Sequence, residues 1–173
     1  ETASLLKNLT GEMLLSISPQ QCDSPFGSAS GAGDIFGAAG GMLEGVMRTF
    51  YELFTGKKLP SLEFENVREP EGFQEINLKM GKQTIRTAVV HGTGNVGRLM
   101  ENIKSGKKQY HYVEIKGCPQ GCARGGGEPL PCEVEMVLTR SRALYEIDIS
   151  KKNRKAHENP IVKKIYEKFQ NFF

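Results

Sequence analysis

The chain has 173 residues, an apolar fraction of 38%, a charged fraction of 25% and a net charge of +3. This length and composition are those of one medium-sized globular domain with a buried core. The small and scattered positive charge gives no basis for nucleic-acid binding. No run of 18 or more apolar residues is present, so we expect no membrane span.

The first half of the chain predicts a polar loop, a glycine-rich segment and a helix, in that order. The loop covers residues 18–27 and leads into the sequence GSASGAGDIFGAAGG. From Met42 to Phe54 apolar residues recur at helical spacing, which predicts a helix with one buried face. Gly56 is expected to end this helix.

The middle of the chain predicts a hairpin followed by a strand–helix–strand unit. Residues 74–80 and 83–91 alternate in polarity on either side of Gly81-Lys82, as the strands of a hairpin do. Residues 94–106 then predict a helix and residues 110–117 a strand. Since a tight crossover through a helix joins parallel strands, we expect an α/β fold with a parallel or mixed sheet flanked by helices.

The end of the chain predicts two helices. Residues 141–149 suggest a short helix. Asn159 is a capping residue and Pro160 suits the first helical position, so the last helix is expected to begin there. No linker is visible, and the chain is expected to form one structural unit.

One candidate motif is glycine-rich and reads Gly92-Thr93-Gly94-Asn95-Val96-Gly97. It follows an apolar strand and precedes a helix, and Glu114 lies at the end of the next strand. This is the pattern of a dinucleotide site, in which a helix N-terminus binds a pyrophosphate and an acid binds the ribose. The same pattern also suits a turn that merely packs a helix close to a strand.

The second candidate motif contains two cysteines and reads E-I-K-G-C-P-Q-G-C-A-R-G-G-G from Glu114 to Gly127. Cys118 and Cys122 leave a strand end, and three glycines remove side chains beside them. Thiolates are the usual ligands of iron–sulfur clusters, and glycines allow a bulky group to approach the backbone. Zinc bound by Cys118, Cys122, Cys132 and His111 is an alternative by ligand type, and free buried thiols are another.

This cysteine motif resembles the third cysteine motif of iron-only ([FeFe]) hydrogenases, E-x-M-x-C-x-x-G-C-x-x-G-G-G-Q-P. GSASGAGDIFGAAGGMLEGVMR is similar to the glycine-rich segment and long helix of that family, and TAVVHGTGN and KKQYHYVEI are similar to its framing strands. RALYEIDISKKNRKAHENPIVKKIYEKF is similar to the C-terminal extension that some members carry as a small subunit. The resemblance implies half of an H-cluster domain, with residues 1–137 as its C-terminal lobe and residues 138–173 as the helical extension.

The resemblance also implies a cofactor and roles for residues. In that family the H-cluster is a [4Fe–4S] cube joined through a cysteine sulfur to a diiron unit with CO, cyanide and a dithiolate bridge. Cys118 would ligate the cube, and Cys122 would bridge cube and diiron unit. Phe36 and Gly37 match residues beside the diiron unit. The implied activity is reversible oxidation of H2. The family binds no nucleotide at its strand–glycine–helix turn, which weakens the dinucleotide interpretation.

Two family motifs that supply the other cluster cysteines, T-S-C-C-P and M-P-C-x-x-K-x-x-E, do not occur in this sequence. Cys22 and Cys132 lie in different contexts and are interpreted as ordinary thiols. We therefore expect the chain to need the N-terminal half of the same domain, either upstream or on a separate subunit, and to be inactive alone. The expected electron partner is ferredoxin or an NAD(P)-linked redox subunit, and cytoplasm is the default location.

Lys116 stands where catalytic family members usually have methionine. A buried ammonium is costly unless it is paired, and it would change the potential of a neighbouring cluster. Lys116 could instead turn toward solvent. Its charge keeps two alternative functions open beside H2 turnover: sensing of H2, or a non-catalytic role as an iron–sulfur assembly relative of the same superfamily.

Overall fold

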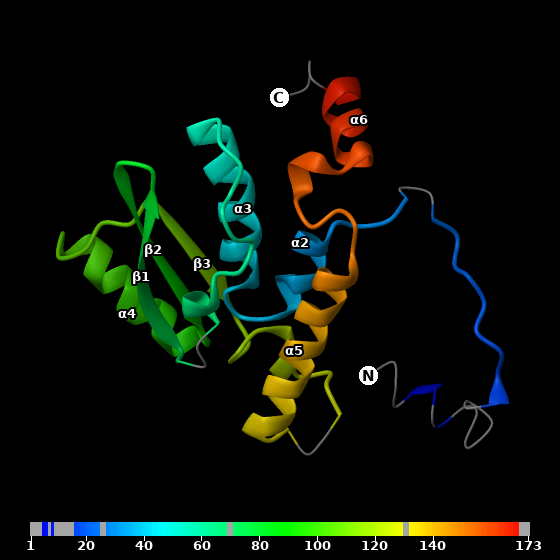
Figure 1. The fold of residues 1–173 in the computed structure, drawn as a ribbon. Helices are drawn as coiled ribbons and strands as arrows, with labels where there is room; N and C mark the ends of the chain where they lie inside the picture. Colours follow the sequence, from blue (N-terminus) through cyan, green and yellow to red (C-terminus); the bar gives the residue numbers. More distant parts are fainter. Residues whose placement is uncertain are drawn as a thin grey trace.

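The computed structural model describes residues 5–6, 8, 16–24, 27–68, 71–129 and 132–169. Within these residues the chain forms one three-stranded mixed sheet with helices around it (Figure 1). The strand order is β1 (Phe73–Met80), β2 (Gln83–His91) and β3 (Tyr112–Lys116). The predicted α/β fold is confirmed. No helix of the described residues is long and apolar enough to cross a membrane.

The predicted hairpin and crossover are both present. β1 and β2 pair antiparallel from Phe73↔Val90 to Met80↔Gln83, and Gly81 supplies the positive φ of +62° at the turn. β2 and β3 pair parallel, and α4 (Thr93–Lys104) makes the connection between them. Parallel neighbours need such a crossover because the chain must return to the same end of the sheet.

Helix α3 (Gly41–Thr55) covers one face of the sheet and α4 covers the other (Figure 1). The α3 face buries a cluster that includes Leu43, Met47 and Val89, and the α4 face buries Ala88, Val90 and Leu99. Because β2 is covered on both faces, its last five residues are all buried. As predicted, Gly56 ends α3, with a φ of +66°.

The C-terminal segment contains α5 (Val134–Ser150) and α6 (Pro160–Phe169). The prediction of a short helix at residues 141–149 was wrong in length, because the helix begins seven residues earlier at Val134. Residues 134–140 contain no glycine or proline, so nothing stops the helix from extending back toward the cysteine motif. The predicted start of α6 is correct: the Asn159 side-chain oxygen accepts the Ile161 N–H at 2.9 Å.

Helix α5 packs on α2 (Gly31–Asp34) and not on the sheet (Figure 1). The described residues also form four short 3-10 turns. They are η2 (Ile35–Gly37), η3 (Glu65–Val67), η4 (Cys122–Arg124) and η5 (Ala156–Glu158). Gly31 allows the close contact, because a Cβ there would lie 2.0 Å from Oδ1 of Asp148 in α5.

Arg48 in α3 joins this helix to α5 although its side chain is fully buried. Its guanidinium donates to both carboxylate oxygens of Asp148 at 2.8 Å and to Glu44, one turn earlier in α3, at 2.7 Å. Its Nε donates to the Leu62 carbonyl at 2.9 Å. Bidentate pairs of this kind are the strong ones, and pairing is required because a lone buried charge is costly.

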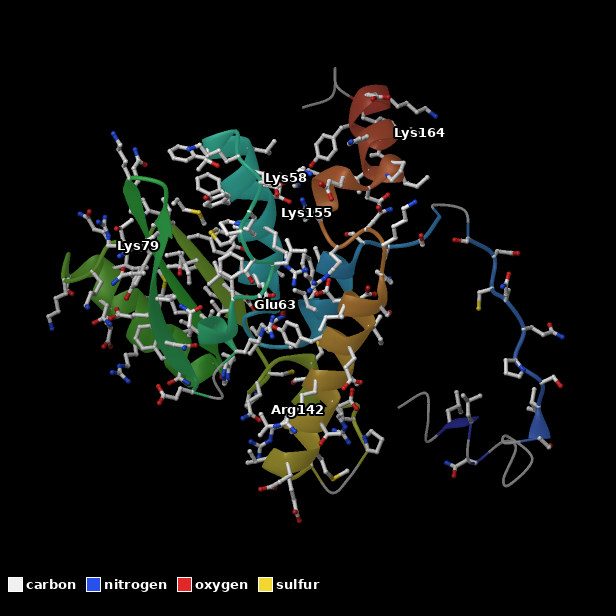
Figure 2. The ribbon with its side chains drawn as sticks, in the orientation of Figure 1. Lys58, Glu63, Lys79, Arg142, Lys155 and Lys164 are labelled. Atoms are coloured by element: carbon white, nitrogen blue, oxygen red, sulfur yellow. The ribbon has the colours of Figure 1, made fainter. Side chains whose placement is uncertain are left out.

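Two further arginines extend this pairing. Arg68 donates to Glu44 and to Glu63, and Arg154 donates to Glu63 at 2.5 Å and to Asp148 at 2.6 Å. Burial alone would raise the pKa of Asp148, but the hydrogen bonds from Arg48 and Arg154 outweigh it and hold that pKa below its usual value. Figure 2 labels Glu63 between α3 and α5. We call this set the ion network: Glu44, Arg48, Glu63, Arg68, Asp148 and Arg154.

Candidate iron–sulfur site

The cysteine loop, which we define as residues 117–129, leaves the sheet at the carboxyl end of β3. Cys118 and Cys122 are both exposed. The chain reverses between them, with Gln120 at a φ of +58° and Gly121 at +78°. Carboxyl ends of parallel strands are where α/β proteins bind their ligands, so the two thiols lie at the edge where a bound group is expected.

The glycine-rich segment contacts the cysteine loop directly. Ala38 and Gly121 form an isolated antiparallel bridge. A Cβ on Gly121 would lie 2.8 Å from the Gly37 carbonyl oxygen, so only glycine allows this approach. Phe36, at 41% exposure, remains at the surface beside this bridge. Residues more than 80 positions apart in the sequence are thereby brought to one place.

Lys116 connects the same two segments, and it does not turn toward solvent. Its side chain is 11% exposed, and its ammonium donates to the Phe36 carbonyl oxygen at 2.5 Å. The carboxylate of Glu114 lies 3.6 Å away. The predicted site residues Phe36, Gly37 and Lys116 therefore lie together, next to the loop that carries Cys118 and Cys122.

Glu114 holds the start of α3 against β3. Its two carboxylate oxygens accept the Gly40 N–H at 3.0 Å and the Leu43 N–H at 2.7 Å. Burial raises the pKa of this carboxyl, and the bond from Leu43 and the charge of Lys116 oppose that rise. Acceptors at a helix N-terminus satisfy amides that have no partner within the helix. Glu114 thus positions the glycine-rich segment that precedes α3.

His91 fixes the backbone of the cysteine loop through a hydrogen bond, a role that the sequence did not reveal. The Gln120 N–H donates to His91 Nδ1 at 2.8 Å, which requires that this nitrogen carries no proton. His91 is 3% exposed. Burial lowers the pKa of its imidazole, and an interaction with the Glu71 backbone offsets only part of this. A neutral His91 is therefore the form that fits the loop.

The space beside the thiols suits a bulky group with sulfur ligands. A Cβ placed on Gly117 or on Gly126 would meet no heavy atom of the described residues within 4 Å, so contacts within this part of the chain do not require these glycines. Two exposed thiols flanked by open glycines fit a cluster that approaches the backbone closely. The residues present thus fit part of an iron–sulfur ligand set.

The zinc alternative fails on geometry. His111 and Cys118 lie beyond opposite ends of β3, roughly 20 Å apart at the usual rise per residue. The His111 Nδ1 also accepts the Arg86 N–H at 2.9 Å. Cys132 contacts Arg140 at 3.5 Å, and Cys22 is exposed in a segment without regular structure. These two thiols do not join Cys118 and Cys122 in any metal-ligand group found among the described residues.

The dinucleotide interpretation also fails on the position of its acid. Glu114 is buried beneath the N-terminus of α3, whereas the glycine motif begins α4 on the other face of the sheet. The Gly92 N–H is already bonded to the Lys116 carbonyl at 3.0 Å. The glycine motif therefore closes the turn between β2 and α4.

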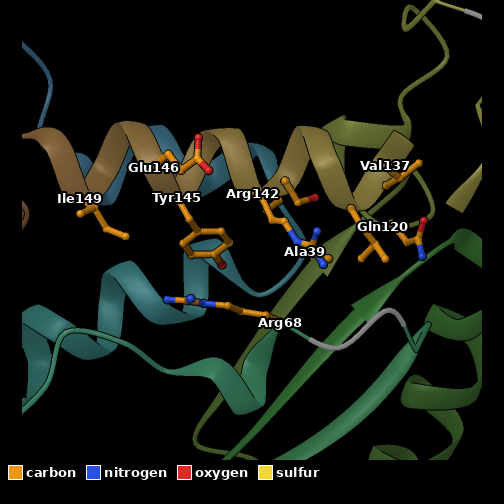
Figure 3. A pocket seen from close by; sticks show the side chains of 11 residues that line it. Ala39, Arg68, Gln120, Val137, Arg142, Tyr145, Glu146 and Ile149 are labelled. Atoms are coloured by element: carbon orange, nitrogen blue, oxygen red, sulfur yellow. The ribbon is translucent and has the colours of Figure 1, made fainter. Parts of the chain in front are cut away.

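A cavity of about 420 Å³ lies between α5 on one side and Ala38, Ala39 and Arg68 on the other, and Gln120 of the cysteine loop also lines it (Figure 3). Tyr145 points from α5 toward Arg68, whose Cζ lies 3.8 Å from the ring centroid. Among the described residues, the Tyr145 hydroxyl and the Gln120 side-chain oxygen are buried without a hydrogen-bond partner. Burial raises the pKa of Tyr145, so its hydroxyl remains a donor. An occupant that offers one acceptor and one donor would satisfy both groups.

A cluster of Glu52, His157 and Glu158 has the composition of a metal site. Lys155 occupies it instead, since its ammonium lies 2.9 Å from Glu52 and 2.7 Å from Glu158. Figure 2 labels Lys155 where the C-terminal segment meets α3. We interpret this cluster as a second set of ion pairs between α3 and that segment.

Comparison with known families decides which cofactor chemistry applies to this site. Residues 1–126 match the family described as "Iron only hydrogenase large subunit, C-terminal domain", and residues 134–171 match "Iron hydrogenase small subunit". The chain belongs to the iron-only hydrogenase family. It corresponds to the C-terminal part of the large subunit, followed by a small-subunit segment.

Relatives and solved structures agree with this assignment. The chain is 38% identical to the NADP-reducing hydrogenase subunit HndD of Solidesulfovibrio fructosivorans, over 98% of this chain and 29% of that protein. It superposes on a variant of the HydA1 hydrogenase of Chlamydomonas reinhardtii with a TM-score of 0.71 and 32% identity, over 98% of this chain and 49% of that one. The chain thus spans between a quarter and a half of these hydrogenases.

Not every relative is named as a hydrogenase. The chain is 32% identical to the cytosolic Fe-S cluster assembly factor narfl of Xenopus tropicalis, over 73% of this chain and 28% of that protein. The matched family model is named for iron-only hydrogenases, and this relative is named for Fe-S cluster assembly. The coarse conclusion is therefore a member of the iron hydrogenase family with an iron–sulfur cofactor.

Proposed function

We propose that this chain is one half of a hydrogenase catalytic domain and that Cys118 and Cys122 hold its cluster. The observation that carries the proposal is the Ala38–Gly121 bridge, because it joins the glycine-rich segment to the cysteine loop. Lys116 reinforces this junction through the Phe36 carbonyl. Family membership supplies the kind of cofactor that such a junction would receive.

The cofactor that we propose is the H-cluster, with a [4Fe–4S] cube and a diiron unit carrying CO, cyanide and a dithiolate bridge. When bound, it supplies the reversible conversion of H2 into protons and electrons. In this proposal Cys118 would be a ligand of the cube, and Cys122 would be the ligand shared by the cube and the diiron unit. Phe36, which lies at the surface beside the Ala38–Gly121 bridge, would exclude water from one side of the bound cluster. Gly37 offers backbone without a side chain, as a group of that size requires.

Cysteine variants test this assignment in a domain completed with the missing half. Cys118→Ser and Cys122→Ser should each lower the iron content and reduce H2 evolution by at least about 100-fold, since thiolate ligation is lost. Cys22→Ser and Cys132→Ser are matched controls and should keep both properties. Full iron content in Cys118→Ser or Cys122→Ser would contradict the ligand assignment.

Lys116 is proposed to tune the cluster. Its charge lies within the junction, where it stabilises added electrons more than a methionine would. Lys116→Met in the completed domain should therefore lower the reduction potential of the cluster and raise turnover. An unchanged potential would show that the charge is screened. A cluster that holds electrons and turns over H2 slowly would suit H2 sensing. An H2 turnover in the unmodified completed domain equal to that of Lys116→Met would exclude that role.

The partner that we propose is the remaining half of the domain, upstream or on a separate chain. Its support is the coverage of 49% of a solved hydrogenase. β3 lies at the edge of the described sheet, and Ile115 in it is 49% exposed. Hydrogen exchange in residues 112–116 should slow when the two halves are combined. Equal exchange in both states would place the second half elsewhere.

The proposed electron partner is ferredoxin or an NAD(P)-linked subunit, and the second of these is favoured by the name of the NADP-reducing relative. Activity of the completed domain with each donor distinguishes them. The division into residues 1–137 and 138–173 and the cytoplasmic location remain predictions. Limited proteolysis and cell fractionation, respectively, would test them.

The second candidate function is iron–sulfur assembly, which the similarity to narfl favours. An assembly factor would bind iron–sulfur clusters without turning over H2. The two functions separate in one measurement, because a completed domain with full iron content and no H2 activity would support assembly. H2 evolution or uptake above background would exclude it as the main role.

A further inference from the structure

Arg140 in α5 contacts the cysteine loop at several points. Its Nη1 donates to the Ala123 carbonyl at 3.2 Å, and its Nη2 donates to the Pro129 carbonyl at 3.0 Å. Nη1 also lies 3.5 Å from Cys132 Sγ and 3.6 Å from a Glu128 carboxylate oxygen. One rigid guanidinium thus spans both ends of the glycine-rich part of the loop.

These contacts lie on either side of the glycines that follow Cys122. Ala123 is the residue after Cys122 and is 5% exposed, so its carbonyl has little access to water. Pro129 follows the glycines that leave open space beside the thiols. Glycine-rich backbone is inherently flexible, and external hydrogen bonds are what restrict it. Arg140 therefore restrains the segment that contains one of the two candidate ligands.

The same helix contacts the other side of the junction. A Cβ on Gly37 would lie 2.7 Å from Leu144 Cδ1, one turn further along α5. Leu144 also packs with Ile35 and Tyr145 against the glycine-rich segment. α5 lies wholly within the small-subunit match, whereas Gly37 and Cys122 lie within the large-subunit match. The small-subunit segment thus touches both sides of the candidate site.

We propose that Arg140 is a positioning residue that fixes the geometry of the Cys122 loop from the small-subunit segment. That this loop holds a cluster rests on the proposed function, but the restraint itself does not. Arg140 acts through backbone carbonyls and needs no contact with the bound group. Its role is to keep Cys122 in one arrangement before the cofactor arrives.

Hydrogen exchange of the full chain without metal tests the restraint. In Arg140→Gln, amides of residues 117–129 should exchange about fivefold faster, as expected when hydrogen bonds that close a loop are lost. Arg142→Gln is the matched control, because within the described residues no hydrogen bond joins this arginine on the same helix to residues 117–129, although it lines the same cavity as Gln120. Arg140→Lys should recover part of the protection, since the ammonium still offers donors.

Two results would overturn the proposal. One is unchanged exchange in Arg140→Gln, and the other is equal acceleration in Arg142→Gln, which would indicate general loosening of α5. Circular dichroism of each variant checks that α5 is still folded. If Arg140→Gln does not fold, the comparison of Arg140→Lys with the unmodified chain decides, with about twofold faster exchange supporting the restraint and no change overturning it.

A second measurement connects the restraint to the cofactor. In the completed domain, loaded anaerobically with ferrous iron and sulfide, the reduction potential of the cube should shift in Arg140→Gln. It should shift less in Arg140→Lys, which keeps the charge, and not at all in Arg142→Gln. If Cys118→Ser retains all its iron, the proposed cluster ligands are wrong. The hydrogen-exchange experiment on the metal-free chain still tests independently whether Arg140 restrains the loop.

Discussion

The α3–α5 interface and the cysteine loop use polar groups in opposite ways. In the ion network, Arg48 and Asp148 have fully buried side chains, and both are fully paired with each other and with neighbours. In the cysteine loop, the thiols of Cys118 and Cys122 are exposed, and the Gln120 side-chain oxygen is buried without a partner among the described residues. The buried polar groups of the first region all have partners within the described residues, and those of the second region do not.

This difference indicates that the ion network stabilises the fold, whereas the cysteine loop is built to bind a ligand or a partner. Buried charges persist only when every partner is present, so the ion network is a permanent interface between the large-subunit and small-subunit segments. Open glycines and unsatisfied groups instead lower stability unless a ligand or partner completes them. Stability should therefore respond strongly to changes in the ion network and weakly to changes at open positions of the loop such as Gly126.

The largest effect is expected from Arg48→Met. Removing this guanidinium leaves Glu44 and Asp148 buried with fewer partners, which should lower the free energy of unfolding by about 3–5 kcal/mol. Urea denaturation measures it. Lys108→Met removes the exposed pair with Glu75 and should cost less than about 1 kcal/mol. Similar losses of unfolding free energy in the two variants would show that the buried ion network contributes no more to stability than an exposed ion pair.

A smaller loss is expected from Gly31→Ala. The new Cβ would lie 2.0 Å from Asp148 Oδ1, so α2 or Asp148 must move, at a cost of about 1–3 kcal/mol. Gly33→Ala is the control in the same short helix, because its Cβ would be 4.0 Å from the nearest atom. The control should be neutral or stabilising by up to about 1 kcal/mol. Thermal unfolding of both variants checks the opposite signs.

Acid should disturb the two regions in different pH windows. The pKa of His91 lies below its ordinary value of 6.5, so the unfolded chain binds more protons just below pH 6.5. Stability at this position is therefore lost as pH falls below about 6.5, by at most about 1.4 kcal/mol per pH unit. Asp148, with a pKa below 3.8, keeps its charge there and loses its contribution only in stronger acid.

Hydrogen exchange at pH 7.5 and pH 5.5, corrected for intrinsic rates, measures this difference. Protection should fall in residues 118–122 and stay constant in residues 44–48. His91→Gln should remove the pH dependence in the loop. Loss of protection in both regions together at pH 5.5 would show that they unfold as one unit.

The smallest effect on stability is expected from Gly126→Ala. Its Cβ would meet no atom within 4 Å in the part of the chain that the structure describes, so the free energy of unfolding should change by less than about 0.5 kcal/mol. Iron retention in the completed domain should nevertheless fall if this space belongs to the cluster. Gly121→Ala in the same loop should be clearly destabilising, because its φ is +78° and its Cβ would press on the Gly37 carbonyl.

Local patterns predicted most elements correctly. The alternation around Gly81 predicted the β1–β2 hairpin, and the apolar spacing from Met42 to Phe54 predicted α3, although Leu53 and Phe54 at the end of the predicted buried face are exposed. These signals are readable because hairpins and amphipathic helices are determined by neighbours within a few residues. The helix α5 was predicted to begin seven residues late, at Ser141, although residues 134–140 contain no glycine or proline.

The role of His91 illustrates what local patterns omit. At the end of an apolar strand it resembles any buried histidine, and its partner Gln120 is 29 residues away. Arg140 and Arg48 are similar cases, since their partners lie on other elements. Local pattern gave no signal for Arg48, because it lies with Glu44 on the side of α3 that faces α5, away from the apolar face of Leu43 and Met47.

By itself the sequence determined the α/β class, the hairpin, the crossover and the family, because each depends on short-range periodicity or on a contiguous motif. Only the tertiary structure decided that Lys116 turns toward Phe36 and that Glu114 caps α3. It also decided that the charges of Glu44, Arg48 and Asp148 are buried between α3 and the C-terminal segment, where partly exposed residues of the ion network complete their pairing. The physical reason is that burial and pairing depend on residues far apart in the chain, whose meeting is set by packing and not by local pattern.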